Sequence, residues 1–250
     1  MVNGLYTASK GMSNILARQD IHAHNLANAN TTGFKLSRMV NRVEIAVGRN
    51  DKNQLHQDEK QEIADVYVSF RQGPMVRTGN RFDLALETKG FFTIEGENGN
   101  VYTRNGSFAL NASGELVTLA GKRVLDENNA PISMKAEIDL KGDQIQVMQD
   151  GGIFLDGNKI AMLGLADFPD MHKMRTAGDG LFSNSDPDGN PLRKPESIDV
   201  RQGFLEGSNV SPIETMASML MEFRNYEADQ KALHAINDTL GKAVNEVGRV

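Results

Sequence analysis

The sequence predicts an α+β protein: a long helix at each end of the chain, and an inserted, mainly β domain between them. Apolar residues recur with helical spacing near both ends, and short alternating runs between glycine and asparagine turns fill the middle. The two terminal helices are expected to pair as a coiled-coil-like layer, and the inserted domain is expected to consist of short strands and hairpins.

The last forty residues, Ser211 to Val250, carry the clearest pattern. One set of residues recurs every seventh position, namely Met219, Tyr226, Leu233, Leu240 and Val247. A second set lies three or four positions away on the same side of a helix, namely Met216, Phe223 and Val244. Ser211 can cap this helix, Pro212 suits its first position, and Glu214 can reach back to the cap. No glycine or proline interrupts residues 213–240, so the helix could extend roughly 40–50 Å and requires a long partner.

Two polar residues fall within this heptad pattern. Gln230 and Asn237 occupy core-type positions in mid-helix, where apolar residues would give more stability. Polar residues at such positions can fix helix register and partner choice at an energetic cost. Alternatively, both side chains lie at a partly solvated edge.

The N-terminal helix is predicted from about Asn3 to Ala27. Its apolar residues are spaced by three, four or seven positions: Leu5, Ala8, Met12, Ile15, Leu16 and Leu26. A turn-rich cluster at residues 28–33 ends it. Because neither terminal helix has another long partner in the chain, we expect the two to pair within a subunit or between neighbours. The expected assembly interface comprises Leu5, Met12, Ile15, Leu26, Met219, Phe223, Tyr226, Leu233, Leu240 and Val244.

The region between the helices is predicted to be extended and then β-rich. Residues 34–47 are expected to be extended, residues 48–62 polar and flexible, and residues 63–70 a strand. Further strands are predicted at residues 82–86, 91–95, 101–104, 107–110, 116–119, 122–125, 145–148, 153–155 and 159–168. Residues 198–205 are expected to return the chain from the β domain to the last helix. The dipeptides Asn98-Gly99 and Asn105-Gly106 are hairpin signals. Residues 186–195, with three prolines, are expected to form a loop.

These patterns divide the chain into four segments. Residues 1–30 form the N-terminal helix of a core helical domain, and residues 31–77 form an extended linker or β segment. Residues 78–205 form a β-rich outer domain, and residues 206–250 form the C-terminal helix of the core domain.

Composition excludes several classes of function. The net charge of −6 argues against nucleic acid as the main partner, because binding to phosphates requires clustered Lys and Arg. The absence of cysteine excludes disulfides and thiol chemistry. No apolar run approaches the roughly 20 residues that cross a bilayer, so no membrane insertion is expected. Residues 1–10 lack the basic stretch and apolar core of a cleavable signal peptide.

No catalytic or metal-binding motif is evident. His22 and His24 lie on opposite sides of a helix, and the other three histidines, His56, His172 and His234, have no companions at ligand spacing. The segment that begins at Asp186 resembles part of a calcium loop but lacks its later acidic ligands, which favours an ordinary turn. Asp83 and Glu87 could form a carboxylate pair, although nothing singles them out. We therefore expect no catalytic residues, no enzyme activity, no metal and no cofactor.

A series of short motifs runs through the whole chain in order. They are Asn25-Leu26-Ala27-Asn28, Thr32-Gly33-Phe34-Lys35, Thr78-Gly79-Asn80, Asp83-Leu84-Ala85, Gly90-Phe91-Phe92, residues 102–108 (Tyr-Thr-Arg-Asn-Gly-Ser-Phe), Gln202-Gly203, Glu206-Gly207-Ser208-Asn209-Val210, and Arg224, Tyr226, Glu227 and Lys231. In these motifs the sequence resembles the flagellar rod and hook proteins of bacteria. It departs from them at His24 and Asp229, where that family often has asparagine.

The resemblance implies a fold and a function. It implies helix pairs that line a hollow shaft with β domains outside, and export through the flagellum's own type III apparatus without a cleavable signal peptide. The implied location is the basal body, and the implied partners are copies of this chain, other rod and hook proteins, and the export apparatus. The implied role is mechanical: helically packed subunits transmit torque, and their lumen passes exported subunits.

Several alternatives remain at this point. Hook proteins are usually longer, so a rod subunit fits better. Residues 206–210 followed by Pro212, together with the modest length, resemble the proximal rod more than the distal rod. A distal rod or hook-type subunit is the alternative. A more remote one is an enzyme or carbohydrate-binding module built on the β region, with terminal helices for oligomerisation. A deep polar pocket within residues 80–200 would favour that last possibility.

Overall fold

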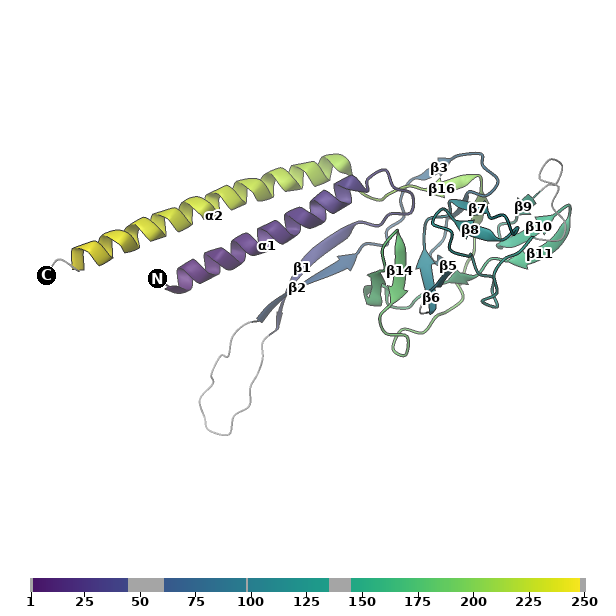
Figure 1. The fold of residues 1–250 in the computed structure, drawn as a ribbon, viewed down its shortest axis with the longest axis horizontal. Coiled ribbons are helices and arrows are strands. Elements are labelled where there is room, and N and C mark those ends of the chain that lie inside the picture. The colour runs from purple at the N-terminus through teal and green to yellow at the C-terminus, as the bar shows by residue number, and fades with distance from the viewer. Residues whose placement is uncertain (1, 45–60, 98, 135–144, 248–250) are drawn as a thin grey trace, which may run out of the picture. The chain divides into compact units, whose positions relative to one another are not determined.

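The computed structural model describes residues 2–44, 61–97, 99–134 and 145–247. The chain divides into two compact units, each with its own internal contacts. The first comprises residues 1–27, 37–67 and 211–250, and the second comprises residues 28–36 and 68–210. The first unit holds both long helices, and the second holds most of the strands (Figure 1). The α+β class predicted from the sequence is therefore confirmed.

Two long helices form most of the first unit. Helix α1 spans Val2–Ala27 and helix α2 spans Pro212–Val247, and they run antiparallel beside each other (Figure 1). At the start of α2, the Ser211 side chain accepts a hydrogen bond from the Glu214 amide at 3.5 Å, as the capping pattern predicted. With 36 residues, α2 extends about 54 Å. A long helix near each end of the chain is thus confirmed.

A two-stranded sheet follows α1. It pairs β1 (Ser37–Glu44) with β2 (Gln61–Val68). The extended structure predicted for residues 34–47 is confirmed in its described part, and so is most of the strand predicted at residues 63–70. The expected flexible segment, residues 48–62, lies outside the described residues except for its last two, which begin β2.

The second unit contains one five-stranded sheet and several smaller ones, all antiparallel. The five-stranded sheet has the order β12 (Leu165–Ala166), β5 (Phe91–Gly96), β6 (Gly99–Thr103), β14 (Leu181–Asn184) and β13 (Met174–Thr176). A three-stranded sheet has the order β11 (Asn158–Met162), β10 (Gly152–Leu155) and β9 (Ile145–Val147). The three pairs are β15 (Val200–Gln202) with β4 (Leu84–Leu86), β16 (Phe204–Glu206) with β3 (Met75–Arg77), and β7 (Phe108–Leu110) with β8 (Leu116–Thr118). A short 3-10 helix, η1 (Met171–Lys173), precedes β13.

Two apolar clusters form the core of this unit. The larger is mostly aliphatic and includes Leu84, Ile94, Leu116, Val124, Ile153 and Val200. The smaller is mostly aromatic and includes Phe91, Tyr102, Phe168 and Phe182. Phe70 packs edge-on against Phe91, with ring centroids 5.3 Å apart. Both clusters draw only on residues of the second unit, so this unit has a core of its own.

Most predicted strands are present, but some are shorter or divided. The strand predicted at residues 159–168 divides into β11 and β12. The expected return segment, residues 198–205, contains β15 and the first two residues of β16, which are separated by Gly203 with a φ of +77°. Residues 122–125 form only isolated bridges. Strands β3, β13 and β14, which have three or four residues each, were not predicted from the sequence. β3 pairs with β16 and β14 pairs with β6, both remote in the sequence, whereas β13 pairs with its neighbour β14. The loop predicted at residues 186–195 contains no helix or strand, as expected.

The hairpin predicted at Asn105-Gly106 is wrong. Strand β6 before it pairs with β5 and β14, and β7 after it pairs with β8. Gly106 is instead required for a close approach of the backbone, since a Cβ there would lie 1.7 Å from the carbonyl oxygen of Leu84. The Asn105 side chain turns the chain locally by accepting a hydrogen bond from the Ser107 amide at 3.1 Å.

Across the described residues, no helix combines the length and the apolar character that are needed to cross a membrane.

Candidate functional site

The face of α2 that lies against α1 follows a heptad spacing. Its least exposed side chains alternate by four and three positions: Thr215, Met219, Glu222, Tyr226, Asp229, Leu233 and Ile236. On α1, Ile15 is buried with 5% exposure. Two contacts fix how the helices meet, since Arg18 pairs with Glu222 and a Cβ on Gly11 would lie 3.6 Å from the Asp229 carboxylate.

The residues of the predicted assembly interface fall into three groups. Ile15 is buried, and Met12, Leu26, Met219, Tyr226 and Leu233 are half-buried. Phe223 is 49% exposed. The side chains of Leu5, Leu240 and Val244 lie outside the described part of the structure.

The polar residues on this face differ from those expected. Gln230 and Asn237, assigned to core-type positions by the sequence, are exposed. The half-buried positions on the face toward α1 instead lie three residues after Met219, Tyr226 and Leu233. They are occupied by Glu222, Asp229 and Ile236. Glu222 accepts ion pairs from Arg18 Nε at 3.4 Å and, when the imidazole is protonated, from His22 Nε2 at 3.6 Å.

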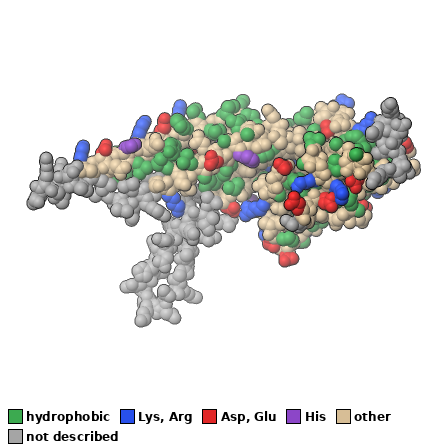
Figure 2. Space-filling view, viewed as in Figure 1, with side chains coloured by type: hydrophobic (Ala, Val, Ile, Leu, Met, Phe, Trp, Pro, Cys, Tyr) green, Lys and Arg blue, Asp and Glu red, His purple; other side chains and the backbone are tan. Residues whose placement is uncertain are grey.

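A second apolar face occupies the first half of α2. Ile213, Met216, Leu220 and Phe223 are spaced by three, four and three positions, and between 49% and 78% of each is exposed. Met221, next to them, is 62% exposed. Figure 2 shows hydrophobic side chains at the surface along the helix pair. Contiguous exposed apolar surface of this kind is typical of interaction sites.

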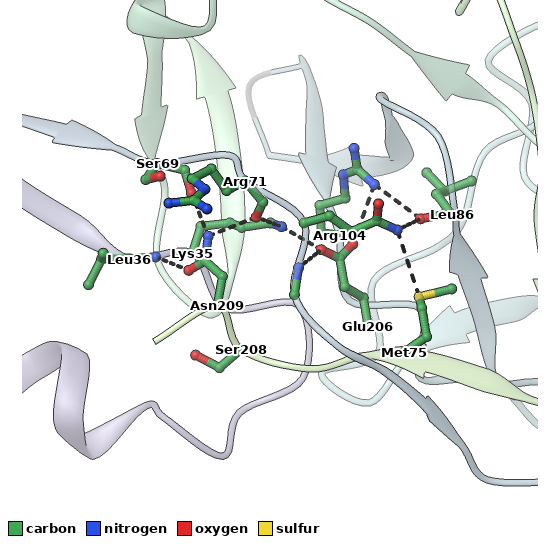
Figure 3. A network of polar contacts seen from close by, with 12 residues as sticks. Lys35, Leu36, Ser69, Arg71, Met75, Leu86, Arg104, Glu206, Ser208 and Asn209 are labelled. Carbon is green, nitrogen blue, oxygen red and sulfur yellow. Dashed lines mark hydrogen bonds and ion pairs between the residues drawn. The ribbon is translucent and has the colours of Figure 1, made fainter. Parts of the chain in front are cut away.

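A buried charge cluster lies where the chain enters and leaves the second unit (Figure 3). Lys35 Nζ lies 2.5 Å from Glu206 Oε1, and Arg104 Nη1 lies 3.3 Å from Glu206 Oε2. The side chains of Lys35 and Glu206 are fully buried, and that of Arg104 is 5% exposed. One carboxylate therefore pairs with two cations that have almost no access to water.

Backbone groups complete the coordination of these charges. Lys35 donates to the carbonyl oxygen of Arg71 at 2.8 Å, and Glu206 accepts from the Gly73 amide at 2.8 Å. Arg104 donates to the carbonyl oxygen of Thr88 at 2.9 Å. Burial lowers the pKa of the Lys35 ammonium and that of the Arg104 guanidinium, although Glu206 opposes both shifts.

Motif residues far apart in the sequence meet around this cluster. Gly33 has φ of +69°, and a Cβ there would lie 2.3 Å from the Asn105 amide nitrogen, so only glycine fits. The Thr32 hydroxyl donates to the Asn105 side-chain oxygen at 2.9 Å. The Gly33 amide donates to the Glu206 carbonyl at 2.7 Å.

Two asparagines of the motifs bind the start of β1 and the residue before it. Asn25 is fully buried and binds both the amide and the carbonyl of Ser37, at 2.9 and 2.8 Å. Asn209 accepts from the Leu36 amide at 2.7 Å. The remaining motif residues Phe34, Ser208 and Val210 are buried, Asn28 is half-buried and accepts from the Thr31 amide, and Ala27 is exposed.

Lys35 and Asn209 were among the site residues predicted from the sequence, but the charged residues of the buried cluster around Lys35 were not. Glu206 and Arg104 occur within the quoted motifs, yet they were not chosen as site residues. Nothing in the local pattern marks them as buried, because charged residues are mostly exposed. The one available signal was that the three motifs hold a lysine, an arginine and a glutamate that could neutralise one another.

The acidic residues weighed for chemistry have structural partners. Asp186 binds Lys173 Nζ at 2.8 Å and the Gly189 amide at 3.0 Å, in a turn. Asp83 accepts from Asn80 at 3.0 Å, and Glu87 pairs with Arg201.

Comparison with known proteins gives a consistent result along the whole chain. Three family models match: "Flagella basal body rod protein" at residues 5–35, "Flagellar hook protein FlgE/F/G D1 domain" at residues 85–155, and "Flagellar basal body rod FlgEFG protein C-terminal" at residues 201–246. The chain is 32% identical to the flagellar basal-body rod protein FlgF of Caulobacter vibrioides, with full coverage of both chains. It is 32% identical to FlgF of Rhizobium meliloti, with 99% coverage of both, and 30% identical to the rod protein FlgG of Agrobacterium fabrum, with 93% and 94% coverage.

Proposed function

This chain belongs to the flagellar basal-body rod protein family, and from that premise we propose that it is a structural subunit of the proximal rod. The observation that carries the proposal is the 32% identity to two FlgF rod proteins over essentially the entire chain. The similarity to FlgG is of the same order, so a distal-rod position is the second candidate. Leu192 is an exposed loop residue, and Leu192→Cys would give this cysteine-free chain a single thiol to label. Electron microscopy of labelled basal bodies tests the position, and a label beside the hook would contradict a proximal one.

The proposed mechanism is mechanical. Subunits pack helically with copies of themselves and with other rod and hook proteins into a hollow shaft that transmits torque and passes exported subunits. The chain itself is exported by the flagellar apparatus without a cleavable signal peptide. The net charge of −6 gives no basis for nucleic acid as a partner.

Helix α2 can serve two helix–helix contacts at once. One face carries Met219, Tyr226 and Leu233 toward α1, which supports a coiled-coil-like pair within the chain. The other carries Ile213, Met216, Leu220 and Phe223 outward with heptad spacing. We assign this outward face to a helix of a neighbouring subunit, which revises the predicted interface by placing Phe223 between subunits.

The charges beyond the outward apolar face also suit contact between copies. From Arg224 onward the exposed charged residues of α2 alternate in sign: Arg224, Glu227, Lys231, Asp238 and Lys242. A surface of alternating sign can pair with another copy of itself when it is suitably offset, whereas a block of like charge would repel. Apolar contacts would therefore lie in the first half of the helix, and charge pairs in the second half.

Replacing Phe223 with aspartate tests this assignment. The substitution places a charge in the proposed contact between subunits, so Phe223→Asp should prevent rod assembly and leave cells without hook or filament. Gln230→Asp is the matched control, because Gln230 is exposed one heptad further along the same helix face. Electron microscopy of basal bodies gives the result. Complete rods in the Phe223→Asp strain would show that this face does not join subunits.

The remote alternative of an enzyme or carbohydrate-binding module has little support. A surface cleft of about 380 Å³ is lined by Arg77, Gly79, Asn80, Arg81, Ile145, Gln202, Gly203 and Phe204. Among these described lining residues there is no carboxylate, histidine or other group that would serve as a general acid–base pair. Both polar groups of the Gln202 side chain are already hydrogen-bonded to the backbone, since its nitrogen donates to the Arg81 carbonyl and its oxygen accepts from the Val147 amide.

A further inference from the structure

The chain crosses between its two units four times, after residues 27, 36, 67 and 210. Three segments of the second unit adjoin these crossings, and we call them passages; hydrogen bonds hold them side by side within that unit. The first passage follows α1 at residues 28–36, the second follows β2 from residue 68, and the third precedes α2 and ends at residue 210. We propose that the side chains of Asn209 and Glu206 fasten these three passages into one joint that moves as a unit. Only its role in carrying torque rests on the proposed function.

Asn209 joins all three passages through one side chain. Its oxygen accepts from the Leu36 amide in the first passage at 2.7 Å. Its nitrogen donates to the carbonyls of Ser69 and Arg71 in the second passage, both at 2.8 Å. A side-chain amide offers two donor hydrogens and one carbonyl acceptor, so every kind of group on it is used. Figure 3 shows Asn209 between these two segments.

Glu206 makes a second set of connections among the same passages. Its Oε1 binds Lys35 of the first passage at 2.5 Å and the Gly73 amide of the second at 2.8 Å. Lys35 reaches across to the Arg71 carbonyl. Because the side chains of Lys35 and Glu206 are fully buried, water has little access to the atoms that make these bonds, and an unmade bond would leave a buried charged group unsatisfied.

The first and second passages are also bonded directly. The Ser69 amide donates to the Leu36 carbonyl at 2.8 Å, while the Leu36 amide is bound by Asn209. A single peptide segment can twist about two soft torsions per residue. Three segments tied at fixed spacing can twist only together, and this is the property that a connection under torque requires.

Asn190 provides a matched control for Asn209. It is fully buried in the same unit, and its side chain also accepts one hydrogen bond and donates two. Those bonds join Asp170 and Asn184, away from the three passages. Asn209→Ala and Asn190→Ala therefore remove similar numbers of hydrogen bonds, but only the first removes a connection among the passages.

Hydrogen exchange of the full-length protein measures the coupling. In Asn209→Ala, the amides of Leu36, Ser69 and Gly73 should all exchange faster, by about tenfold, the factor that corresponds to one lost hydrogen bond. In Asn190→Ala these three amides should exchange as in the unsubstituted protein, while that of Asp170 exchanges faster. If only the Leu36 amide, which loses its acceptor, responds to Asn209→Ala, the passages are independent and the proposal is overturned.

A second variant keeps the test decisive if the alanine variant does not fold. Asn209→Asp retains the acceptor for Leu36 but turns a carboxylate oxygen toward the carbonyls of Ser69 and Arg71. It should speed exchange at Ser69 and Gly73. Unchanged exchange at both residues would contradict the joint.

Swimming in viscous medium tests the torque-bearing role. Cells with Asn209→Ala should assemble rods yet swim more slowly at high load than cells with Asn190→Ala. Equal speeds would overturn the mechanical role. Deletion of the whole gene tests the proposed function by itself. If the chain is a rod subunit, the deletion abolishes motility; if the deleted strain still swims, the chain is not a rod subunit, whatever the Asn209→Ala strain does.

Discussion

At the scale of single residues, Glu206 is the most consequential side chain of the second unit. It is fully buried between Lys35 and Arg104 and is the carboxylate that pairs directly with both cations. The attraction within such a cluster only partly offsets the desolvation of its charges. Removal of the one anion is therefore far more destabilising than the net strength of the cluster suggests.

Glu206→Gln should lower the free energy of unfolding by about 3–5 kcal/mol, because the buried Lys35 loses its ion-pair partner and Arg104 keeps only the attraction of Asp167. Asp186→Asn is the control, since it breaks a pair with Lys173 in which both side chains are well exposed. The control should unfold at nearly the same denaturant concentration as the unsubstituted protein. Urea denaturation followed by β-sheet circular dichroism compares the two, and equal midpoints would mean that the cluster is not sensitive to its anion.

Lys35 should make stability depend on alkaline pH. Burial lowers its pKa from 10.5, so on the alkaline side the unfolded chain binds more protons at this residue than the folded chain does. The contribution of Lys35 to the free energy of unfolding therefore rises with pH, from its lowered folded pKa up to 10.5. Lys35→Met removes this dependence. Urea denaturation of both proteins at about pH 8 and about pH 10 should show that the free energy of unfolding of the unsubstituted protein rises relative to that of the variant. A fall relative to the variant would contradict this prediction.

The sequence could identify the motifs of this cluster but not their pairing. Lys35 and Glu206 are separated by 171 positions, and no local periodicity relates residues so far apart. Burial of a charged side chain is a property of the folded chain, and composition gives no sign of it. Gly33 and Gly106 likewise appear as ordinary turn residues until the backbone that approaches each of them is known.

At the scale of elements, helices were easier to predict than strands. Residues three and four positions apart determine a helix, so both helices and the cap at Ser211 followed from local spacing. Several short strands depend on partners elsewhere, as with β3, which pairs with β16, and β14, which pairs with β6. The hairpin signal at Asn105-Gly106 was outweighed by the approach of β4. Heptad spacing located Met219, Tyr226 and Leu233 on the face of α2 toward α1, but it assigned Gln230 to that face where the structure places the adjacent residue, Asp229.

That difference gives a prediction for α2. Asp229 lies on the face toward α1, opposite Gly11, whereas its neighbour Gln230 is exposed. Asp229→Leu should stabilise the helix pair by about 1 kcal/mol, since part of a leucine side chain would be buried beside the space left by glycine. Gln230→Leu should give no such gain. Thermal melting of the helical circular dichroism signal measures both, and a larger gain from Gln230→Leu would restore the core position assigned from the sequence.

At the scale of the whole molecule, the chain separates two kinds of stability. The second unit has two apolar clusters and a buried charge cluster of its own. The first unit has a helix pair whose longer member leaves large apolar side chains exposed. Membership of the rod protein family is consistent with this difference. The second unit buries its large apolar side chains in a core of its own, whereas the first unit leaves apolar surface on α2 available for contacts in the assembled rod.

Deletion of residues 211–250 should therefore remove assembly without unfolding the second unit. Among the side chains of that segment that the structure describes, none belongs to either apolar cluster of the second unit. The β-sheet signal of that unit should therefore persist, and its melting temperature should change by less than about 5 °C. The deletion removes both apolar faces of α2, and the strain should make neither hook nor filament.

The shorter deletion of residues 241–250 should also stop rod growth if Val244 and Val247 lie in the predicted interface between helices. For both deletions, circular dichroism of the purified protein tests whether the second unit stays folded, and electron microscopy of basal bodies tests whether rods assemble. Complete rods would show that α2 does not organise the assembly, and loss of the β-sheet signal would show that the two units do not fold independently.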